Sequence, residues 1–181
     1  ILVCLLLAAC TPISHLYASE FDIIIHEIMY HPSESNLCGE FVEIYNRGTA
    51  AVDVSGWQLV DEQQVMYTLP ANTLMSGGGY LVFYNDPNAV ECYGLSAPQS
   101  FGPYKGKLDN GGEHIQLKNA SGTLIDEVNY SDDPPWPVEA DGVGPSLELI
   151  SPTADNSHPG SWGLGQFYSP GMANNPLAPG G

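Results

Sequence analysis

Residues 40–46 (EFVEIYN) and 55–61 (SGWQLVD) decide the fold that we predict for this chain. In the first stretch, Val42 and Ile44 lie on one side, and aromatic and acidic residues alternate with them on the other. Such alternation is typical of a β-strand with two different faces. A turn region separates the second stretch, which contains Trp57. Together the stretches predict two short strands, with Trp57 in the protein interior.

The composition predicts the same class of fold for the whole chain. Glycine occurs 20 times and proline 15 times in 181 residues, and turn residues recur at intervals of roughly ten residues. No segment has a sustained helical period. We therefore predict an all-β sandwich. A domain of about 150 residues buries roughly 70% of its unfolded surface, which is enough for one core.

Further motifs occur in a fixed order along the chain. They are IHEIMY (25–30), SGGGYLVF (76–83), NGGE (110–113), DEVNY (126–130), PWP (135–137) and GPSLE (144–148), followed by Trp162. With the opening stretch, this set resembles the lamin tail domain, an immunoglobulin-like β-sandwich that bacteria also carry on secreted and surface proteins. The resemblance implies that residues 19–173 form one such domain, which binds rather than catalyses. The chain departs from the family pattern at His26, where Asn is expected, and in an insertion at 86–104.

The first 18 residues are predicted to be an export leader with a short tether. The apolar run ILVCLLLAA is too short to span a bilayer and ends in small residues. Residues 7–10 (LAAC) resemble the bacterial lipobox, which implies lipidation of Cys10 and an outer-membrane or cell-surface location. Cleavage after Ala18, giving a secreted protein, is the alternative. At the other end, residues 174–181 are predicted to be a linker or disordered tail.

Cysteine usage fits an exported protein. If Cys4 is removed with the leader and Cys10 is lipidated, Cys38 and Cys92 remain as a pair. An oxidising compartment would let them form a disulfide bond, worth at most about 4 kcal/mol in the chain-entropy model. Two free buried thiols are the alternative.

The charge separates the possible partners. Twenty-one acidic residues against four basic ones give a net charge of −17. Phosphate backbones are bound by clustered Lys and Arg, so the composition argues against nucleic acid as a partner. A strongly acidic surface is typical of an exported protein kept soluble by self-repulsion. The membrane contact that we expect is through the lipid anchor alone.

Residues 26–31 (HEIMYH) resemble a zinc-protease motif only superficially. That motif places two His residues four positions apart on a helix, with Glu between them as the base. Here they are five apart on a predicted strand, so they point to opposite faces. No nucleophile elbow or phosphate loop occurs either. We predict no catalytic residues and no required cofactor.

Calcium is the metal that the acidic residues could bind. One loop contains four carboxylates: Asp132, Asp133, Glu139 and Asp141. A second group at strand positions could meet across a sheet: Glu27, Glu40, Glu43 and Asp61. Calcium prefers several oxygen ligands, and adjacent carboxylates repel unless something neutralises them. The alternative for both groups is solvated charge or carboxylates that accept backbone hydrogen bonds.

The insertion at 86–104 is the predicted recognition loop. It is long and rich in turns, and Tyr93, Phe101 and Tyr104 could present aromatic faces to a ligand. Cys92 would fasten it to the rest of the domain. We expect a cell-surface protein or a polysaccharide as its ligand.

The sequence therefore predicts an exported, non-catalytic binding or scaffolding module, lipid-anchored at the bacterial cell surface. One alternative is an accessory domain of a larger secreted hydrolase, for example a nuclease. Another is a calcium-dependent binding domain, or an enzyme with a metal site at residues 132–141.

Overall fold

The computed structural model describes residues 19–62, 64–166 and 168–177. These residues form thirteen strands, one α-helix, α1 (Ala89–Cys92), and three 3-10 helices at Glu20–Asp22, Val138–Ala140 and Pro159–Ser161. The predicted leader with Cys10 and the last four residues lie outside the described part. The prevalence of strands confirms the predicted all-β class.

The larger of two main sheets has the strand order β13-β12-β11-β1-β2-β7-β8. Its strands are β1 (Ile23–Met29), β2 (Phe41–Asn46), β7 (Tyr80–Tyr84), β8 (Ser100–Phe101), β11 (Leu147–Leu149), β12 (Trp162–Gly165) and β13 (Pro176–Leu177). Neighbouring strands are antiparallel except β7 and β8. The opening stretch of sequence is β2, and it pairs on both sides, with β1 and β7.

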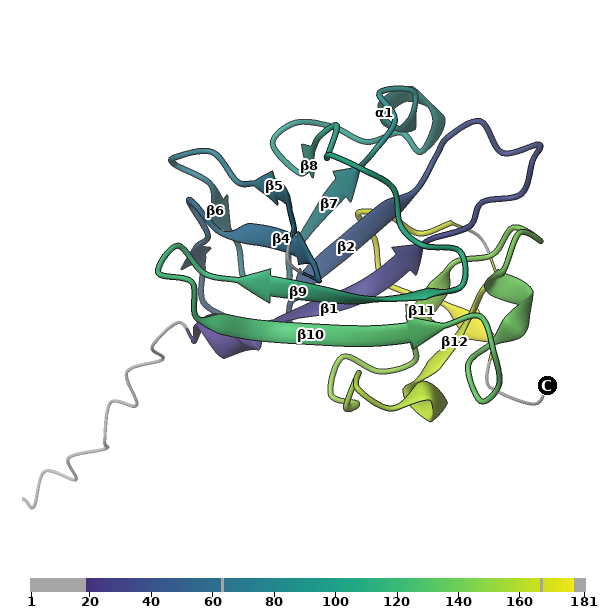
Figure 1. The fold of residues 1–181 in the computed structure, drawn as a ribbon. Coiled ribbons are helices and arrows are strands. Elements are labelled where there is room, and N and C mark those ends of the chain that lie inside the picture. The colour runs from purple at the N-terminus through teal and green to yellow at the C-terminus, as the bar shows by residue number, and fades with distance from the viewer. Residues whose placement is uncertain (1–18, 63, 167, 178–181) are drawn as a thin grey trace, which may run out of the picture.

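The smaller sheet packs against one face of the larger one. It has the order β10-β9-β4-β5, from β4 (Gln58–Asp61), β5 (Gln64–Thr68), β9 (Gly112–Lys118) and β10 (Leu124–Ser131), and β3 (Val52–Asp53) pairs with β6 (Leu74–Met75) beside it. Figure 1 shows β9 and β10 in front of β1 and β2. Val42 and Ile44 lie in the core between the sheets, with Trp57, Leu59 and Trp162. The alternation in β2 and the interior position of Trp57 are thus confirmed.

The other face of the larger sheet is also covered. Phe41 packs there with Met29 and Val82, under Tyr93 and Leu95, which follow helix α1. Further along the same face lies the chain after β12. This double coverage explains why all seven residues of β1 are buried, since only a strand with protein on both faces is apolar or shielded throughout.

The folded domain extends beyond the predicted boundary at residue 173. Asn174 donates through Nδ2 to the carbonyl oxygens of His26 (2.9 Å) and Leu149 (3.2 Å), and Pro176–Leu177 pairs with β12. The prediction of a linker was therefore wrong for residues 174–177. Asn, Pro and Leu are typical of a linker. Here, however, the Asn174 side chain bonds β1 and β11, and the backbone of Pro176–Leu177 pairs with β12.

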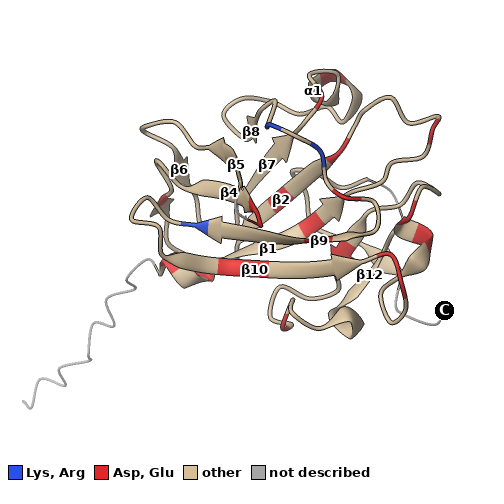
Figure 2. Ribbon diagram, in the orientation of Figure 1, with Lys and Arg blue, Asp and Glu red and all other residues tan. Residues whose placement is uncertain are grey.

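Acidic residues occur on strands and loops throughout the domain, whereas Lys and Arg are few (Figure 2). No helix within the described residues is long and apolar enough to cross a membrane.

Candidate binding site

The predicted disulfide bond is present. Cys38 and Cys92 are bonded, with Cα atoms 5.4 Å apart. The bond fastens the end of helix α1 to the loop between β1 and β2, so the insertion at 86–104 is held against the sheet as expected. Tyr93 reinforces this contact, because its hydroxyl donates to the carbonyl oxygen of Gly39 at 2.9 Å.

The three aromatic residues predicted to bind a ligand from this insertion face inward. Tyr104 is 4% exposed, and its hydroxyl donates to Glu40 Oε2 at 3.1 Å. Phe101 packs on the core, and the Tyr93 ring lies edge-on to Phe41 with centroids 5.1 Å apart. Tyr104 therefore belongs to the core, whereas Tyr93 and Phe101 are half-buried, and ligand binding by these two residues stays a prediction. The sequence prediction counted aromatic residues but could not show which way they point.

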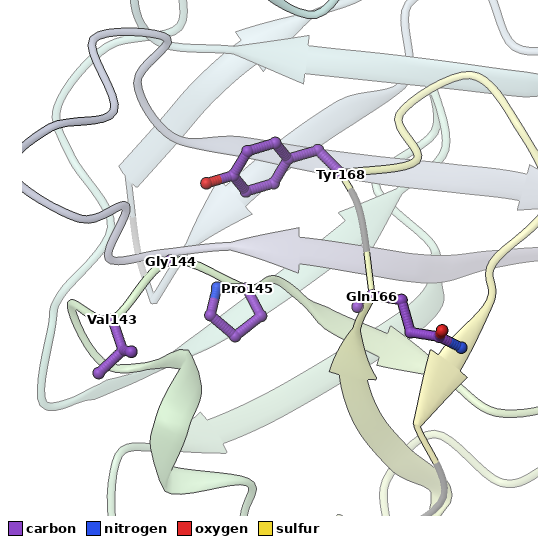
Figure 3. Close-up of a pocket in the computed structure, with 6 residues that line it drawn as sticks. Val143, Gly144, Pro145, Gln166 and Tyr168 are labelled. Atoms are coloured by element: carbon purple, nitrogen blue, oxygen red, sulfur yellow. The ribbon is translucent and has the colours of Figure 1, made fainter.

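An open groove of about 500 Å³ lies close to the insertion, beside Tyr168. Its lining consists of Val143, Gly144, Pro145, Gly165, Gln166 and Tyr168, and we call it the Tyr168 groove. In Figure 3 the Tyr168 ring projects from the segment after β12 towards Gly144 and Pro145. Tyr168 is 37% exposed and Val143 70% exposed, so both present apolar surface to solvent.

A second hollow, of about 450 Å³, shares Tyr168 with this groove. It is lined by Ser33, Ser35, Asn36, Leu37, Cys38, Cys92 and Tyr168. Leu37 is 75% exposed. Among the described residues that line the two hollows, no group is ionisable other than the Tyr168 phenol, in a chain with a net charge of −17.

Tyr168 is positioned from beneath by the insertion. Its ring meets the Tyr93 ring edge-on, with centroids 5.5 Å apart, and Tyr93 follows the disulfide-bonded Cys92. Gly144 lies opposite, at φ +135°, a conformation that favours glycine. Sequence reasoning missed Tyr168. The one local signal was an aromatic residue before Ser-Pro-Gly, which is a turn sequence late in the chain.

A row of three buried glutamates lies on the covered face of the larger sheet. Glu27 on β1 is in register with Glu43 on β2 and with Glu148 on β11. All three are 0% exposed. We call these residues the glutamate row. Carboxylates of like charge on adjacent strands destabilise each other, and burial adds the cost of losing water.

Burial is the largest cause of the raised pKa values of the glutamate row. It raises the pKa of Glu27 to about 8, and the neighbouring charge of Glu148 adds to this shift. Burial also raises the pKa of Glu43 well above its usual range. The pKa of Glu148 is raised by burial against the lowering effect of hydrogen bonds from Asn175 and Ser169. The row therefore favours protonated carboxyls.

The second acidic group predicted from the sequence is divided between three places. Of its members, Glu27 and Glu43 do meet, as register partners. Glu40 lies elsewhere and accepts from Asn85 Nδ2 (2.8 Å), the Tyr104 hydroxyl and the Leu108 amide (2.9 Å). Asp61, in the smaller sheet, lies beside Glu113, whose pKa is raised to about 8 by burial and by that neighbour.

The predicted calcium loop places its four carboxylates in different surroundings. Asp141 is hydrogen-bonded to His31 Nδ1, and Asp132 is half-buried, whereas Asp133 and Glu139 are exposed. Within the described residues, no three His, Cys, Asp or Glu side chains are grouped so as to hold a metal ion. Calcium binding at this loop stays a prediction.

The stretch HEIMYH lies on strand β1 and the residues after it, as the sequence analysis required. His26 is buried, and its Nδ1 lies 3.2 Å from Glu43 Oε1. Burial lowers the pKa of His26 to about 4. A neutral imidazole is therefore hydrogen-bonded to a carboxyl that burial also keeps neutral.

Two packed β-sheets with these motifs in order define an immunoglobulin-like sandwich. The family description "Lamin Tail Domain" matches residues 18–132. The chain therefore belongs to the lamin tail domain family, which consists of non-catalytic immunoglobulin-like domains. No curated protein matches the chain. The match ends before β11, so the glutamate row combines residues inside and outside it, whereas the residues that line the Tyr168 groove all lie beyond it.

Proposed function

We propose that this chain is an exported binding module, anchored by a lipid on Cys10, that holds a neutral polysaccharide in the Tyr168 groove. The observation that carries this proposal is the exposed Tyr168 ring, which lines two hollows whose other described lining residues are uncharged. An aromatic face binds the apolar face of a sugar ring, and nearby hydroxyl and amide groups can bond its hydroxyls. Ser33, Asn36 and Gln166 supply such groups.

The charge of the domain favours a neutral ligand. Anionic polymers would be repelled by a net charge of −17. A cationic ligand would be bound best by acidic side chains, but the described residues that line the groove include none. Neutral sugars satisfy both conditions, and their binding would depend little on salt.

Affinity electrophoresis in gels that contain neutral polysaccharides tests the groove. The wild-type protein should be retarded by at least one such polymer, and 0.5 M salt should leave binding unchanged in a pull-down with the same polymer. Tyr168→Ala should weaken binding by at least about tenfold, the usual effect of removing a central aromatic anchor. Phe21→Ala is the matched control, because Phe21 is an exposed aromatic (59%) that does not line the groove. Equal retardation of both variants would contradict the proposal.

Mass spectrometry of the exported protein tests the anchor. The proposal expects an N-terminal peptide that begins at Cys10 and carries acyl chains. A Cys10→Ser variant should lose the acyl chains and leave the membrane fraction. An unmodified mature chain that begins at Ser19 would instead show ordinary secretion.

A further inference from the structure

The segment that carries Tyr168 is held down by the glutamate row. We call residues 168–175 the C-terminal segment. Ser169 Oγ lies 3.0 Å from Glu27 Oε2, the Gly171 amide donates to Glu43 Oε2, and the Asn175 amide donates to Glu148 Oε2 at 2.7 Å. Each member of the row thus contacts the segment.

Ser169 shows how many protons this arrangement needs. Its Oγ lies 3.0 Å from Glu27 Oε2 and also 3.0 Å from Glu148 Oε1. A hydroxyl has a single proton to donate. If both carboxyls were ionised, one of these contacts would bring two oxygen atoms together without a hydrogen between them. A third acceptor, Asn174 Oδ1 at 3.5 Å, competes for the same proton. One of the two glutamates must therefore be protonated and donate to Ser169.

Among the described residues, no fixed positive charge replaces this proton. The titratable groups that face the row are His26 on β1, Tyr45 on β2, Tyr80 on β7 and Tyr93 after α1, and Tyr168 lies at the start of the segment. Among the described residues, no Lys or Arg lies within 4.0 Å of a carboxyl oxygen of the row. Loss of the proton would leave buried like charges side by side.

We propose that a proton shared by Glu27, Ser169 and Glu148 latches the C-terminal segment onto the sheet, and that its loss releases the segment. The latch stands on the geometry of these residues. Its consequence for ligand binding rests on the proposed function: release moves Tyr168 away from Tyr93 and dismantles the groove. The domain then binds its polysaccharide at acidic and neutral pH and releases it at alkaline pH.

The raised pKa of Glu27 supports release of the segment at alkaline pH. Since the pKa of Glu27 is raised to about 8, the latch is closed at pH 6 and opens as the pH rises towards 9. His26 does not act in this range, because its pKa is lowered to about 4.

Hydrogen–deuterium exchange of the exported protein, without ligand, tests the latch directly. After correction for the intrinsic exchange rate, protection of peptides covering 168–175 should fall about tenfold between pH 6 and pH 9, as expected for a group with a pKa near 8. Peptides from β9 and β10 should keep their protection. Constant protection of the segment over this range would overturn the proposal.

A neutral replacement supplies the matched variant. Glu148→Gln cannot ionise, and its amide can still donate to Ser169 and accept from Asn175, so protection at pH 9 should equal that at pH 6. Glu139→Gln, at an exposed glutamate, should keep the wild-type profile. If Glu148→Gln loses protection as the wild type does, the latch does not depend on this proton.

A spectroscopic measurement on the wild type remains decisive if Glu148→Gln does not fold. Carboxyl-carbon NMR should show at least one neutral glutamate of the row at pH 6, and three ionised carboxylates would overturn the latch. Polysaccharide retardation at pH 6 and pH 9 then separates the two proposals. If the exchange of the segment changes with pH but the protein is retarded at neither pH, the proposed ligand is wrong and the latch stands.

Discussion

At the scale of single residues, two tyrosines whose rings meet in the core differ in the surroundings of their hydroxyl groups. The rings of Tyr30 and Tyr130 lie 4.7 Å apart, and both residues are buried. The Tyr130 hydroxyl donates to the carbonyl oxygen of Asp109 at 2.7 Å. The Tyr30 hydroxyl is the one buried side-chain oxygen or nitrogen in the described part of the chain without a hydrogen-bond partner.

We predict opposite effects for the two matched substitutions. Tyr30→Phe removes a buried hydroxyl that has no partner, so it should raise the free energy of unfolding by up to about 1 kcal/mol. Tyr130→Phe leaves the Asp109 carbonyl without its donor and should lower it by about 1 kcal/mol. Urea denaturation at constant pH measures both. Equal losses of stability would show that the Tyr30 hydroxyl has a partner in solution.

The sequence predicted part of the glutamate row. Glu27 and Glu43 lie in alternating stretches, so their meeting across neighbouring strands followed from the strand pattern. Glu148 could not be placed, because its pairing with Glu27 depends on the position of β11 in the sheet, and the two residues are far apart in the chain. The exposure of Tyr168 could not be predicted for the same reason, because the exposure of an aromatic residue depends on what packs over it.

At the scale of elements, the disulfide bond joins the one α-helix of the described chain to the loop between β1 and β2. The bonded residues are separated by 54 positions. They also line the hollow beside Tyr168, so the bond shapes the candidate binding surface as well as the fold. Within the helix Ala89 is buried, and Tyr93 and Leu95, which follow the helix, pack against the sheet.

Removal of this bond should lower stability markedly. A loop of this length corresponds to about 4 kcal/mol in the chain-entropy model, which is an upper expectation. The double variant Cys38→Ala/Cys92→Ala should therefore unfold at lower denaturant concentration, by up to that free energy. Reductant should destabilise the wild type and leave the variant unchanged. A variant as stable as the oxidised wild type would show that the bond constrains little.

The strands themselves were largely predictable, and the covering segments were not. Alternation in β2 and the glycine-rich turn before β7 are local patterns, which the fold preserves. Residues 174–177 have no such pattern, and they join the sheet because Asn174 bonds the backbone of two distant strands. Contacts of this kind depend on the finished sheet and leave no local trace in the sequence.

At the scale of the whole molecule, the first question is whether calcium contributes to stability. The exposed Asp133 and Glu139, and the engagement of Asp141 by His31, favour solvated charge over a metal site. We therefore expect equal melting temperatures in calcium and in chelator at matched ionic strength. A calcium ion present at 100 times its dissociation constant would add about 2.7 kcal/mol. A rise of that size, absent with Asp132→Ala, would instead support the loop at 132–141.

The second whole-molecule property is the dependence of stability on pH. Glu27 and Glu113 have pKa values raised to about 8, so the folded chain keeps protons that the unfolded chain releases above its ordinary glutamate pKa. As the pH rises from the unfolded pKa towards 8, each such proton makes the free energy of unfolding fall by about 1.4 kcal/mol per pH unit. This contribution is fully present below the unfolded pKa and is lost as pH rises through 8. His26, lowered to about 4, acts oppositely, and only below about pH 6.5.

Between pH 6.5 and pH 9 the free energy of unfolding should therefore fall. The net charge of −17 also destabilises the compact state by self-repulsion, but salt screens that effect and leaves buried groups almost untouched. Denaturant midpoints measured at low salt and at 0.5 M salt separate the two causes. The fall should persist in salt, and Glu27→Gln and Glu113→Gln should each flatten it. A slope that vanishes in salt would assign the whole effect to surface charge and leave the buried glutamates without a role in it.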